Sequence, residues 1–221
     1  MSVRSKKAFA ERPARYVRMP RHLGIIPDGN RRWADQRSLP RGGGYLPGVD
    51  AAFRVLEEIE RLGVEEVSIY GFTKENVRRP SDQRHEFQKA CVEAVRRLER
   101  MNAELRAVGD SRSPMFPEEL LKYTERTVFG SGGTKINLLI NYSWKWDVEM
   151  LMGTGTLGSH DVSPIDLIIR WGGRSRLSGF LPIQSVYADI YVLDRLWPDG
   201  SGEDVYEALE WYQEQDPTRG G

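Results

Sequence analysis

The chain has 221 residues, enough for one domain with a full-sized hydrophobic core. Its 32 basic side chains balance its 32 acidic ones, which argues against a protein that holds nucleic acid through the phosphate backbone. The single cysteine excludes an internal disulfide and favours a reducing compartment, and no apolar run approaches the ~20 residues of a membrane-spanning helix. We therefore expect a cytoplasmic protein whose membrane contact is at most peripheral.

Residues 1–21 carry seven basic side chains and one acidic one, without the apolar segment of a signal peptide. We interpret them as a flexible basic tail, followed by a single domain over residues 22–221. Docking of the tail on a membrane surface or on a partner is the alternative.

The first predicted strand, over residues 23–26, leads into a turn-forming Asp-Gly-Asn that begins at Asp28, and Arg31 and Arg32 follow at once. This order indicates a buried strand, a tight turn and the start of a helix, where free N–H groups favour anions. An anion site that contains its own carboxylate is explained if a cation joins the two negative groups. We therefore expect Mg²⁺ between Asp28 and a diphosphate.

Strands and helices then alternate along the chain. Apolar residues at helical spacing predict helices over residues 52–62, 87–101 and 117–126. Short apolar runs predict strands over residues 64–72, 105–108, 136–141, 165–170 and 187–193. This alternation predicts an α/β fold, a single domain with a mostly parallel central sheet flanked by helices. The apolar stripe of the second helix is typical of core, and would line a substrate only if that substrate is hydrophobic.

Three of the predicted strands end in polar or charged clusters, at residues 28–32, 73–79 and 170–178. Because ligands of open parallel sheets lie beyond the carboxyl ends of the strands, we expect these clusters to converge. In the second cluster Asn76 could help a proton leave and Arg79 could hold phosphate oxygens. A capped helix start with solvated arginines is the alternative there.

The third cluster crowds three arginines around a Gly-rich turn: Arg170, Arg174 and Arg176. Cations this close together repel one another unless an anion joins them or local acids pair with them. We expect phosphate binding, with pairing to local acids as the alternative.

Several motifs in one order now resemble the cis-prenyltransferase family, the enzymes related to undecaprenyl diphosphate synthase. They are DGNRRWA from Asp28, GFTKENVRRP from Gly71, NYSWKWD from Asn141, residues 166–178, YADIY from Tyr187 and LWPD from Leu196. The resemblance implies a homodimeric, Mg²⁺-dependent prenyltransferase that acts on isoprenoid diphosphates.

Carried over residue by residue, the resemblance makes Asp28 a metal ligand that also assists deprotonation together with Asn76. The allylic diphosphate would be held by Gly29, Asn30, Arg32 and Arg41. The second diphosphate would be held by Arg170, Arg176 and Ser178, and the partner subunit's C-terminal arginine, Arg219 in this chain, would complete that site. Further predicted substrate contacts are Arg31, Tyr45, Thr73, Arg79, Trp171 and Arg174, and Asp189 is a predicted metal ligand.

The chain departs from the family pattern around the second substrate. Trp144 stands in place of a glycine, Trp171 in place of a small hydroxyl residue, and Arg174 in place of a glutamate. Tyr45 replaces a histidine and Asp189 a glutamate. The metal and diphosphate residues are thus retained while the surroundings of the second substrate are rebuilt.

The segments between residues 80 and 110 and between 146 and 164 are also compressed, which favours a small product over a long polyprenyl chain. We expect two dimethylallyl diphosphates to couple head-to-middle into a branched or cyclised C10 diphosphate, as in the bacterial lavandulyl and cyclolavandulyl branch. The alternatives are ordinary short-chain cis elongation with isopentenyl diphosphate and a non-catalytic partner subunit. A nucleotide-phosphate binder is disfavoured, because the chain lacks a Gly-x-x-x-x-Gly-Lys-Ser/Thr loop.

Overall fold

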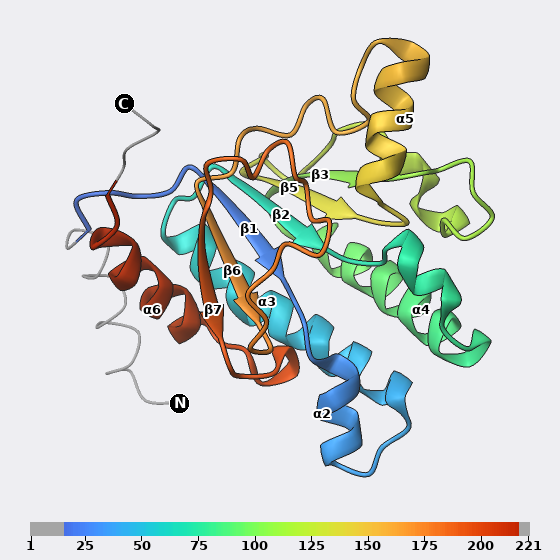
Figure 1. Ribbon diagram of the computed structural model, residues 1–221, viewed down its shortest axis with the longest axis horizontal. Coiled ribbons are helices and arrows are strands. Elements are labelled where there is room, and N and C mark those ends of the chain that lie inside the picture. The colour runs from blue at the N-terminus through green and yellow to red at the C-terminus, as the bar shows by residue number, and fades with distance from the viewer. Residues whose placement is uncertain (1–15, 217–221) are drawn as a thin grey trace.

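A seven-stranded sheet forms the centre of the molecule in the computed structural model, which describes residues 16–216 (Figure 1). The strands are β1 (His22–Ile26), β2 (Glu66–Tyr70), β3 (Ala103–Val108), β4 (Thr127–Phe129), β5 (Thr134–Leu139), β6 (Leu167–Trp171) and β7 (Asp189–Leu193). Their order is β4-β3-β5-β2-β1-β6-β7, and every neighbouring pair is parallel except β3 and β4. The predicted α/β domain with a mostly parallel sheet is confirmed.

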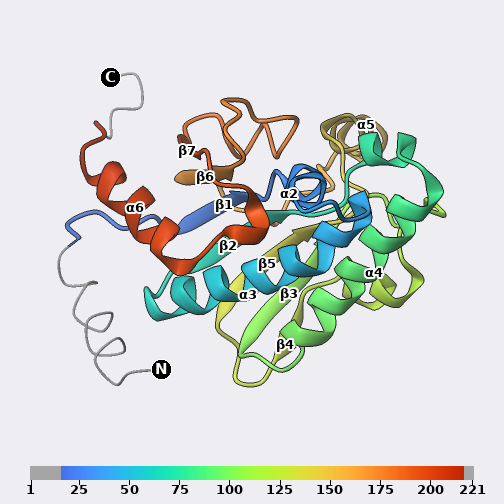
Figure 2. The same ribbon diagram turned by 90° about the horizontal axis from the view of Figure 1, so that it is seen from below.

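Helices cover both faces of this sheet, as Figure 2 shows. One face packs against α3 (Tyr45–Arg61), α4 (Ser81–Leu98) and α6 (Gly202–Gln213). The other face packs against α5 (Trp144–Thr154) and the loop between β6 and β7. Because side chains alternate along a strand, successive residues of each strand enter different cores. In β6, for example, Ile169 belongs to the first core and Ile168 to the second.

Four observed elements differ from those expected from the sequence. The helix expected over residues 117–126 is a shorter 3-10 helix, Glu118–Tyr123. Neither α5 nor α6 was expected, although the sequence signals the start of α6: Ser201 and Asp204 form a capping box, with each side chain bonded to the other's backbone N–H. The short strand β4 was not expected either.

The last residues of the predicted tail contact the rest of the chain. Gln213 in α6 accepts hydrogen bonds from the backbone N–H groups of Val17 and Arg18, both at 3.0 Å. The Arg18 guanidinium stacks 3.7 Å from the centre of the Tyr212 ring. Val17 and Arg18 therefore pack on α6. Residues 1–15 of the predicted tail lie outside the described residues. Within residues 16–216 no helix combines the length and apolarity needed to cross a bilayer.

A buried polar cluster lies at the amino-terminal edge of the sheet, away from the carboxyl ends of the strands. His22, 1% exposed, contacts the carbonyl oxygen of Ser163 through Nδ1 and the hydroxyl of Ser68 through Nε2, both at 2.9 Å. Since a carbonyl can only accept, Nδ1 carries the proton and Nε2 accepts from Ser68. Asn137 extends the cluster to the carboxylate of Glu66 at 2.6 Å.

We expect this cluster to destabilise the protein in mild acid. Burial lowers the pKa of His22 below its ordinary value of 6.5, against the attraction of Glu66. Below pH 6.5 the unfolded chain protonates this histidine while the folded chain does not, so stability falls as the pH drops towards the folded pKa. Urea unfolding at a series of pH values should show the fall, and His22→Gln should reduce its slope. His160→Gln, at an exposed site, is the control; equal slopes in all three proteins would contradict the prediction.

Candidate active site

A cavity of about 610 Å³ lies at the carboxyl ends of β1, β2 and β6. The chain continues from β1 to β2 on one side and returns to β6 on the other, so β1 and β6 flank a topological switch point of the sheet. All three polar clusters expected from the sequence contribute to the cavity wall. The convergence expected of these clusters is therefore present in the structure.

Most of the predicted site residues line this cavity. They are Asp28, Gly29, Asn30, Arg31, Arg32, Arg41, Tyr45, Thr73, Asn76, Arg79, Arg170, Arg176 and Ser178. Among the described residues, six arginines line it against three acids, Asp28, Asp35 and Glu75. Although the chain as a whole is neutral, this site has an excess of positive charge and is suited to an anionic ligand.

Asp28 and Arg170 form the centre of the charged part. Arg170 Nη2 donates to Asp28 Oδ2 at 3.0 Å, and its Nη1 donates to Ser178 Oγ at 3.1 Å. The Arg170 side chain is 3% exposed, and its Nε is buried without a partner in the part of the chain that the structure describes. Burial lowers the pKa of Arg170, while the Asp28 carboxylate opposes that change. Because this guanidinium is poorly hydrated, its interaction with a bound anion would be more favourable than that of a solvent-exposed arginine.

Asp28 also fits the expected magnesium ion, though only as a single protein ligand. Its carboxylate is 36% exposed and faces the cavity, with Arg32 at 3.4 Å from Oδ1. Residues 16–216 contain no cluster of three or more histidine, cysteine or acidic side chains that could hold a metal by itself. Mg²⁺ commonly binds through one or two carboxylates together with substrate phosphates, and this donor set suits that mode.

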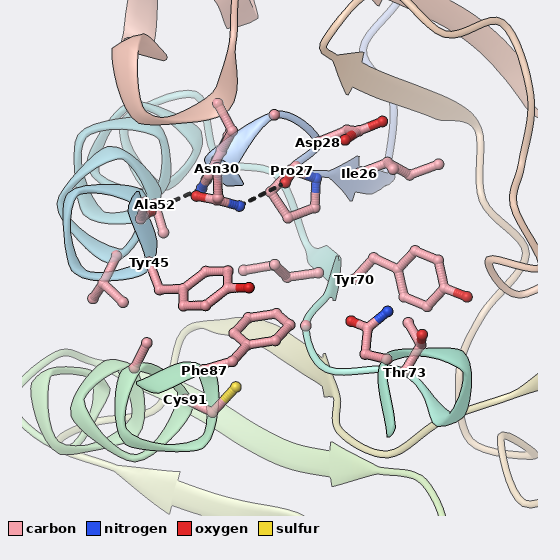
Figure 3. Close-up of a pocket in the computed structure, with 18 of the residues that line it drawn as sticks. Ile26, Pro27, Asp28, Asn30, Tyr45, Ala52, Tyr70, Thr73, Phe87 and Cys91 are labelled. Carbon is pink, nitrogen blue, oxygen red and sulfur yellow. Dashed lines mark hydrogen bonds between the residues drawn. The ribbon is translucent and has the colours of Figure 1, made fainter. Parts of the chain in front are cut away.

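The turn after β1 is held in place by close backbone packing. Gly29 has φ +116°, and a side chain there would meet Leu196 at about 3 Å, so glycine is required. Asn30 begins α2 (Asn30–Gln36) and donates to the carbonyl of Pro27 at 3.1 Å, as Figure 3 shows. These contacts fix the direction in which Asp28 leaves the strand.

The inner part of the cavity is apolar. The rings of Tyr45 and Phe87 stack at 4.6 Å with an angle of 16° between their planes, and Cys91 lies on the far side of them from Asn30 (Figure 3). Further apolar lining comes from Val49, Ala52, Phe53, Leu56, Ala90, Ala94, Leu98 and Leu138. The stripe on α4 thus contributes to the core and also lines the cavity. Burial raises the pKa of Cys91 to about 12, so its thiol is an inert wall group.

Arg79 joins the charged and apolar parts of the cavity. Its Nη1 donates to the Tyr45 hydroxyl at 3.1 Å, and burial lowers its pKa. Tyr45, which stands where the family pattern has a histidine, therefore orients a cationic side chain at the boundary between the two parts. A ligand with an anionic head and an apolar tail matches this division.

The structure places Trp171 in the core, which corrects the prediction that it contacts substrate. Its side chain is 0% exposed and belongs to the core on the α3 and α6 side of the sheet. Arg170 lines the cavity, and the next residue of a strand points to the opposite face. The prediction placed two adjacent strand residues in one site and ignored this alternation.

Two further predicted residues lie away from the cavity. Arg174 is exposed and is not part of the lining. Asp189 begins β7 at the amino-terminal edge of the sheet, where Arg18 lies 3.6 Å away and burial raises the pKa of the carboxyl. The geometry therefore does not support Asp189 as a metal ligand beside Asp28 within one chain. Arg219 lies outside the described residues.

Two aromatic residues of the cavity wall, Tyr70 and Trp197, were not expected there from the sequence. Tyr70 ends β2, and its hydroxyl donates to the carbonyl of Ser178 at 3.0 Å, which ties the second cluster to the third. Trp197 belongs to the LWPD motif, which is recognisable in the sequence, but the sequence does not indicate that Trp197 lines the cavity.

Comparison with known proteins gives one consistent family. A family model described as "Putative undecaprenyl diphosphate synthase" matches residues 26–155 and 152–220. An isoprenyl transferase of Neisseria meningitidis serogroup B is 31% identical, with 95% of this chain and 93% of that protein aligned. A ditrans,polycis-undecaprenyl-diphosphate synthase of Pseudomonas putida, described as (2E,6E)-farnesyl-diphosphate specific, is 33% identical, with 90% and 89% aligned.

A solved structure shares the fold. Lavandulyl diphosphate synthase from Lavandula x intermedia, crystallised with dimethylallyl diphosphate, superposes with a TM-score of 0.77. The alignment covers 91% of this chain and 98% of that one, at 22% sequence identity. At this identity the likeness shows a common architecture.

Proposed function

The chain belongs to the cis-prenyltransferase family, and from that premise we propose that it condenses two C5 isoprenoid diphosphates. The proposed substrates are two molecules of dimethylallyl diphosphate, coupled head-to-middle. The proposed product is a branched or cyclised C10 diphosphate of the lavandulyl type, formed with release of diphosphate.

The observation that carries this proposal is the division of the cavity into a charged part and an apolar part. Asp28 and six arginines line the charged part, and side chains of α3 and α4 line the apolar part. An isoprenoid diphosphate, with an anionic head and an apolar chain, matches this division.

In the proposed reaction one bond breaks and one forms. The C1–O bond of one dimethylallyl diphosphate breaks, and its electron pair leaves with the diphosphate. The double bond of the second molecule supplies the electrons for the new carbon–carbon bond. A proton lost from the resulting cation restores a neutral hydrocarbon skeleton. Negative charge therefore develops on the leaving diphosphate, where a preorganised cationic site stabilises it most.

The cavity-lining residues divide this work. Arg32 and Arg79 would hold the leaving diphosphate, and Asp28 would hold Mg²⁺. When bound, Mg²⁺ withdraws electron density from the diphosphate and so makes it a better leaving group. Arg170 and Ser178 would hold the second diphosphate, and Asn76 would assist the loss of the proton together with the Asp28 carboxylate.

The surroundings of the second diphosphate support a substrate other than isopentenyl diphosphate. Gly179 has φ +81°, and Trp144 lies against it, 3.0 Å from the position that a side-chain carbon would take. Trp144, at a position where the family pattern has glycine, thus packs against the residue that follows Ser178. The lavandulyl diphosphate synthase that shares the fold was crystallised with dimethylallyl diphosphate, which adds support.

The deciding experiment is an incubation of the purified protein and MgCl₂ with dimethylallyl diphosphate alone, and then with isopentenyl diphosphate added. Products are dephosphorylated and identified by gas chromatography and mass spectrometry. A branched or cyclic C10 alcohol from dimethylallyl diphosphate alone supports the proposal. Product only with isopentenyl diphosphate indicates ordinary cis elongation, which the names of the bacterial relatives favour. No diphosphate release in either case indicates a non-catalytic partner subunit.

We retain the homodimer as part of the proposal, with Arg219 completing the second diphosphate site of the partner subunit. Localisation in the cytoplasm likewise stays a prediction, based on the single cysteine. Sedimentation of the full chain, compared with a variant that lacks residues 219–221, tests whether the protein is a homodimer. Truncation should raise the KM of the second substrate.

The apolar end of the cavity should set substrate length. Leu98, which is 2% exposed, lines the cavity from α4. Leu98→Ala should enlarge the cavity, and turnover of ten-carbon geranyl diphosphate should rise relative to dimethylallyl diphosphate. Leu62→Ala is the matched control, since Leu62 is buried but does not line the cavity. Both changes should cost about 2–5 kcal/mol of stability, so an equal substrate ratio in the two variants would contradict the prediction.

A further inference from the structure

Trp171 is the largest fully buried side chain among the described residues, and it directly follows the arginine at the centre of the charged site. We propose that Trp171 is a positioning residue that holds the diphosphate-binding side chains in place through Trp197. The identity of the ligand, a diphosphate, rests on the proposed function. The structural part of the inference rests on the contacts of Trp171 alone.

Both chain neighbours of Trp171 are bonded to the turn after β1. Arg170 donates to the carboxylate of Asp28 at 3.0 Å. The carbonyl of Gly172 accepts from Arg32 Nη2 at 2.9 Å. Because peptide bonds join these residues to Trp171, a displacement of its backbone would move two contacts of the charged site at once.

The Trp171 side chain is fixed on the far side of the sheet. Its Nε1–H donates to Asp204 Oδ2 at 2.9 Å, inside the first turn of α6. Asp204 is 0% exposed, and the same Oδ2 accepts from the backbone N–H of Ser201 at 2.9 Å. Its other oxygen, Oδ1, accepts from the Arg195 guanidinium. A buried carboxylate with three donors is a firm anchor for the indole.

The indole then supports the cavity wall. It meets the ring of Trp197 edge-to-face, with centroids 4.7 Å apart and planes at 77°. Trp197 lines the cavity and donates through Nε1 to the carbonyl of Gly48 in α3 at 2.8 Å. Its backbone N–H donates to the carbonyl of Asp28 at 3.0 Å. Contacts therefore run without a gap from α6 through Trp171 and Trp197 to Asp28.

A smaller side chain at position 171 would leave unfilled space behind Trp197, because the surrounding core relaxes only in part. Trp197 and the backbone of Asp28 would then be less restrained. The same residues would still line the cavity, but they would no longer be held in the positions that bind an anion. Small displacements of binding groups lower the affinity considerably.

The test measures the affinity for inorganic pyrophosphate in MgCl₂ by isothermal titration calorimetry, which needs no turnover. Trp171→Phe should raise the Kd roughly tenfold, the effect of losing about 1.4 kcal/mol. The KM for dimethylallyl diphosphate should rise in step. Trp211→Phe is the matched control: Trp211 lies on α6, packs on Tyr191 at 5.3 Å and does not line the cavity. It should leave the Kd unchanged.

A double-mutant cycle tests the route through Trp197. If Trp171 acts through Trp197, adding Trp171→Phe to Trp197→Phe should cause little further loss, whereas additive losses would overturn the route. Should Trp171→Phe fail to fold, Asp204→Asn keeps the volume and weakens the bond to the indole, but it also removes the ion pair with Arg195. Arg195→Gln removes that ion pair alone and is the control. Asp204→Asn should raise the Kd above that of Arg195→Gln, and equal Kd values in the two variants would overturn the inference.

The outcomes separate this inference from the proposed function. Weakened pyrophosphate binding in Trp171→Phe supports the inference even if no C10 product forms. Unchanged binding in a protein that makes the C10 product overturns the inference and leaves the function intact. A wild-type protein that does not bind magnesium pyrophosphate would overturn both.

Discussion

Asp28→Ala is expected to reduce turnover by roughly 10³-fold, since the several kcal/mol that metal coordination contributes to leaving-group stabilisation would be lost. Among the described acids of the cavity wall, Asp28 is the one that pairs with Arg170 in the charged centre. Its removal takes away the protein's expected ligand for Mg²⁺ and leaves the buried guanidinium without its carboxylate partner. The KM should change less than kcat, because the arginines proposed to hold the diphosphates remain.

The measurement is the steady-state rate of diphosphate release at saturating MgCl₂, with thermal unfolding to verify the fold. Asp35→Ala is the matched control. Asp35 also lines the cavity and pairs with an arginine, Arg41 at 3.1 Å, whereas Asp28 is the acid paired with Arg170. It should retain most of the activity. Near-normal turnover in Asp28→Ala would remove Asp28 from the proposed metal site.

Arg170→Ala should raise the KM of the second substrate on the order of 100-fold, because losing one partner of a buried, hydrogen-bonded charge pair costs about 2–5 kcal/mol. Arg170→Lys should not restore the wild-type KM. The guanidinium spans Asp28 and Ser178 at the same time through two different nitrogens, and an ammonium group cannot reproduce that fork.

Initial rates over a range of the second substrate, at fixed MgCl₂, measure this effect. Arg174→Ala provides the control from the same loop, since Arg174 is exposed and does not line the cavity. Its KM should stay within about twofold of the wild-type value, as for most exposed charges. A similar KM increase in both variants would mean that the loop acts through its overall charge rather than through Arg170.

Arg170 and Asp28 are in direct contact at 3.0 Å. The family resemblance assigns Arg170 to the second diphosphate and Asp28 to the metal at the first. If both assignments hold, the two diphosphates are bound at one connected charged centre. We therefore expect each of the two substitutions to affect both substrates, with the larger KM effect on the second.

The sequence by itself determined the fold class and the composition of the charged site. Apolar runs alternating with amphipathic segments are local patterns, and they were sufficient to predict the parallel sheet. The clusters that contain Asp28, Asn76 and Arg170 each lie at the end of a strand, so parallel topology alone required that they meet. Motif residues at the carboxyl ends of strands could thus be assigned to one site from local sequence patterns.

Only the tertiary structure decided which side chains face the cavity. Arg170 and Trp171 are adjacent in sequence, yet strand alternation sends one to the site and the other to the core beneath it. Asp189 lies in a recognisable motif, but its strand begins at the opposite edge of the sheet. The support that Trp197 receives from Trp171 and α6 joins segments distant in sequence. Such contacts depend on packing between elements, which no local pattern encodes.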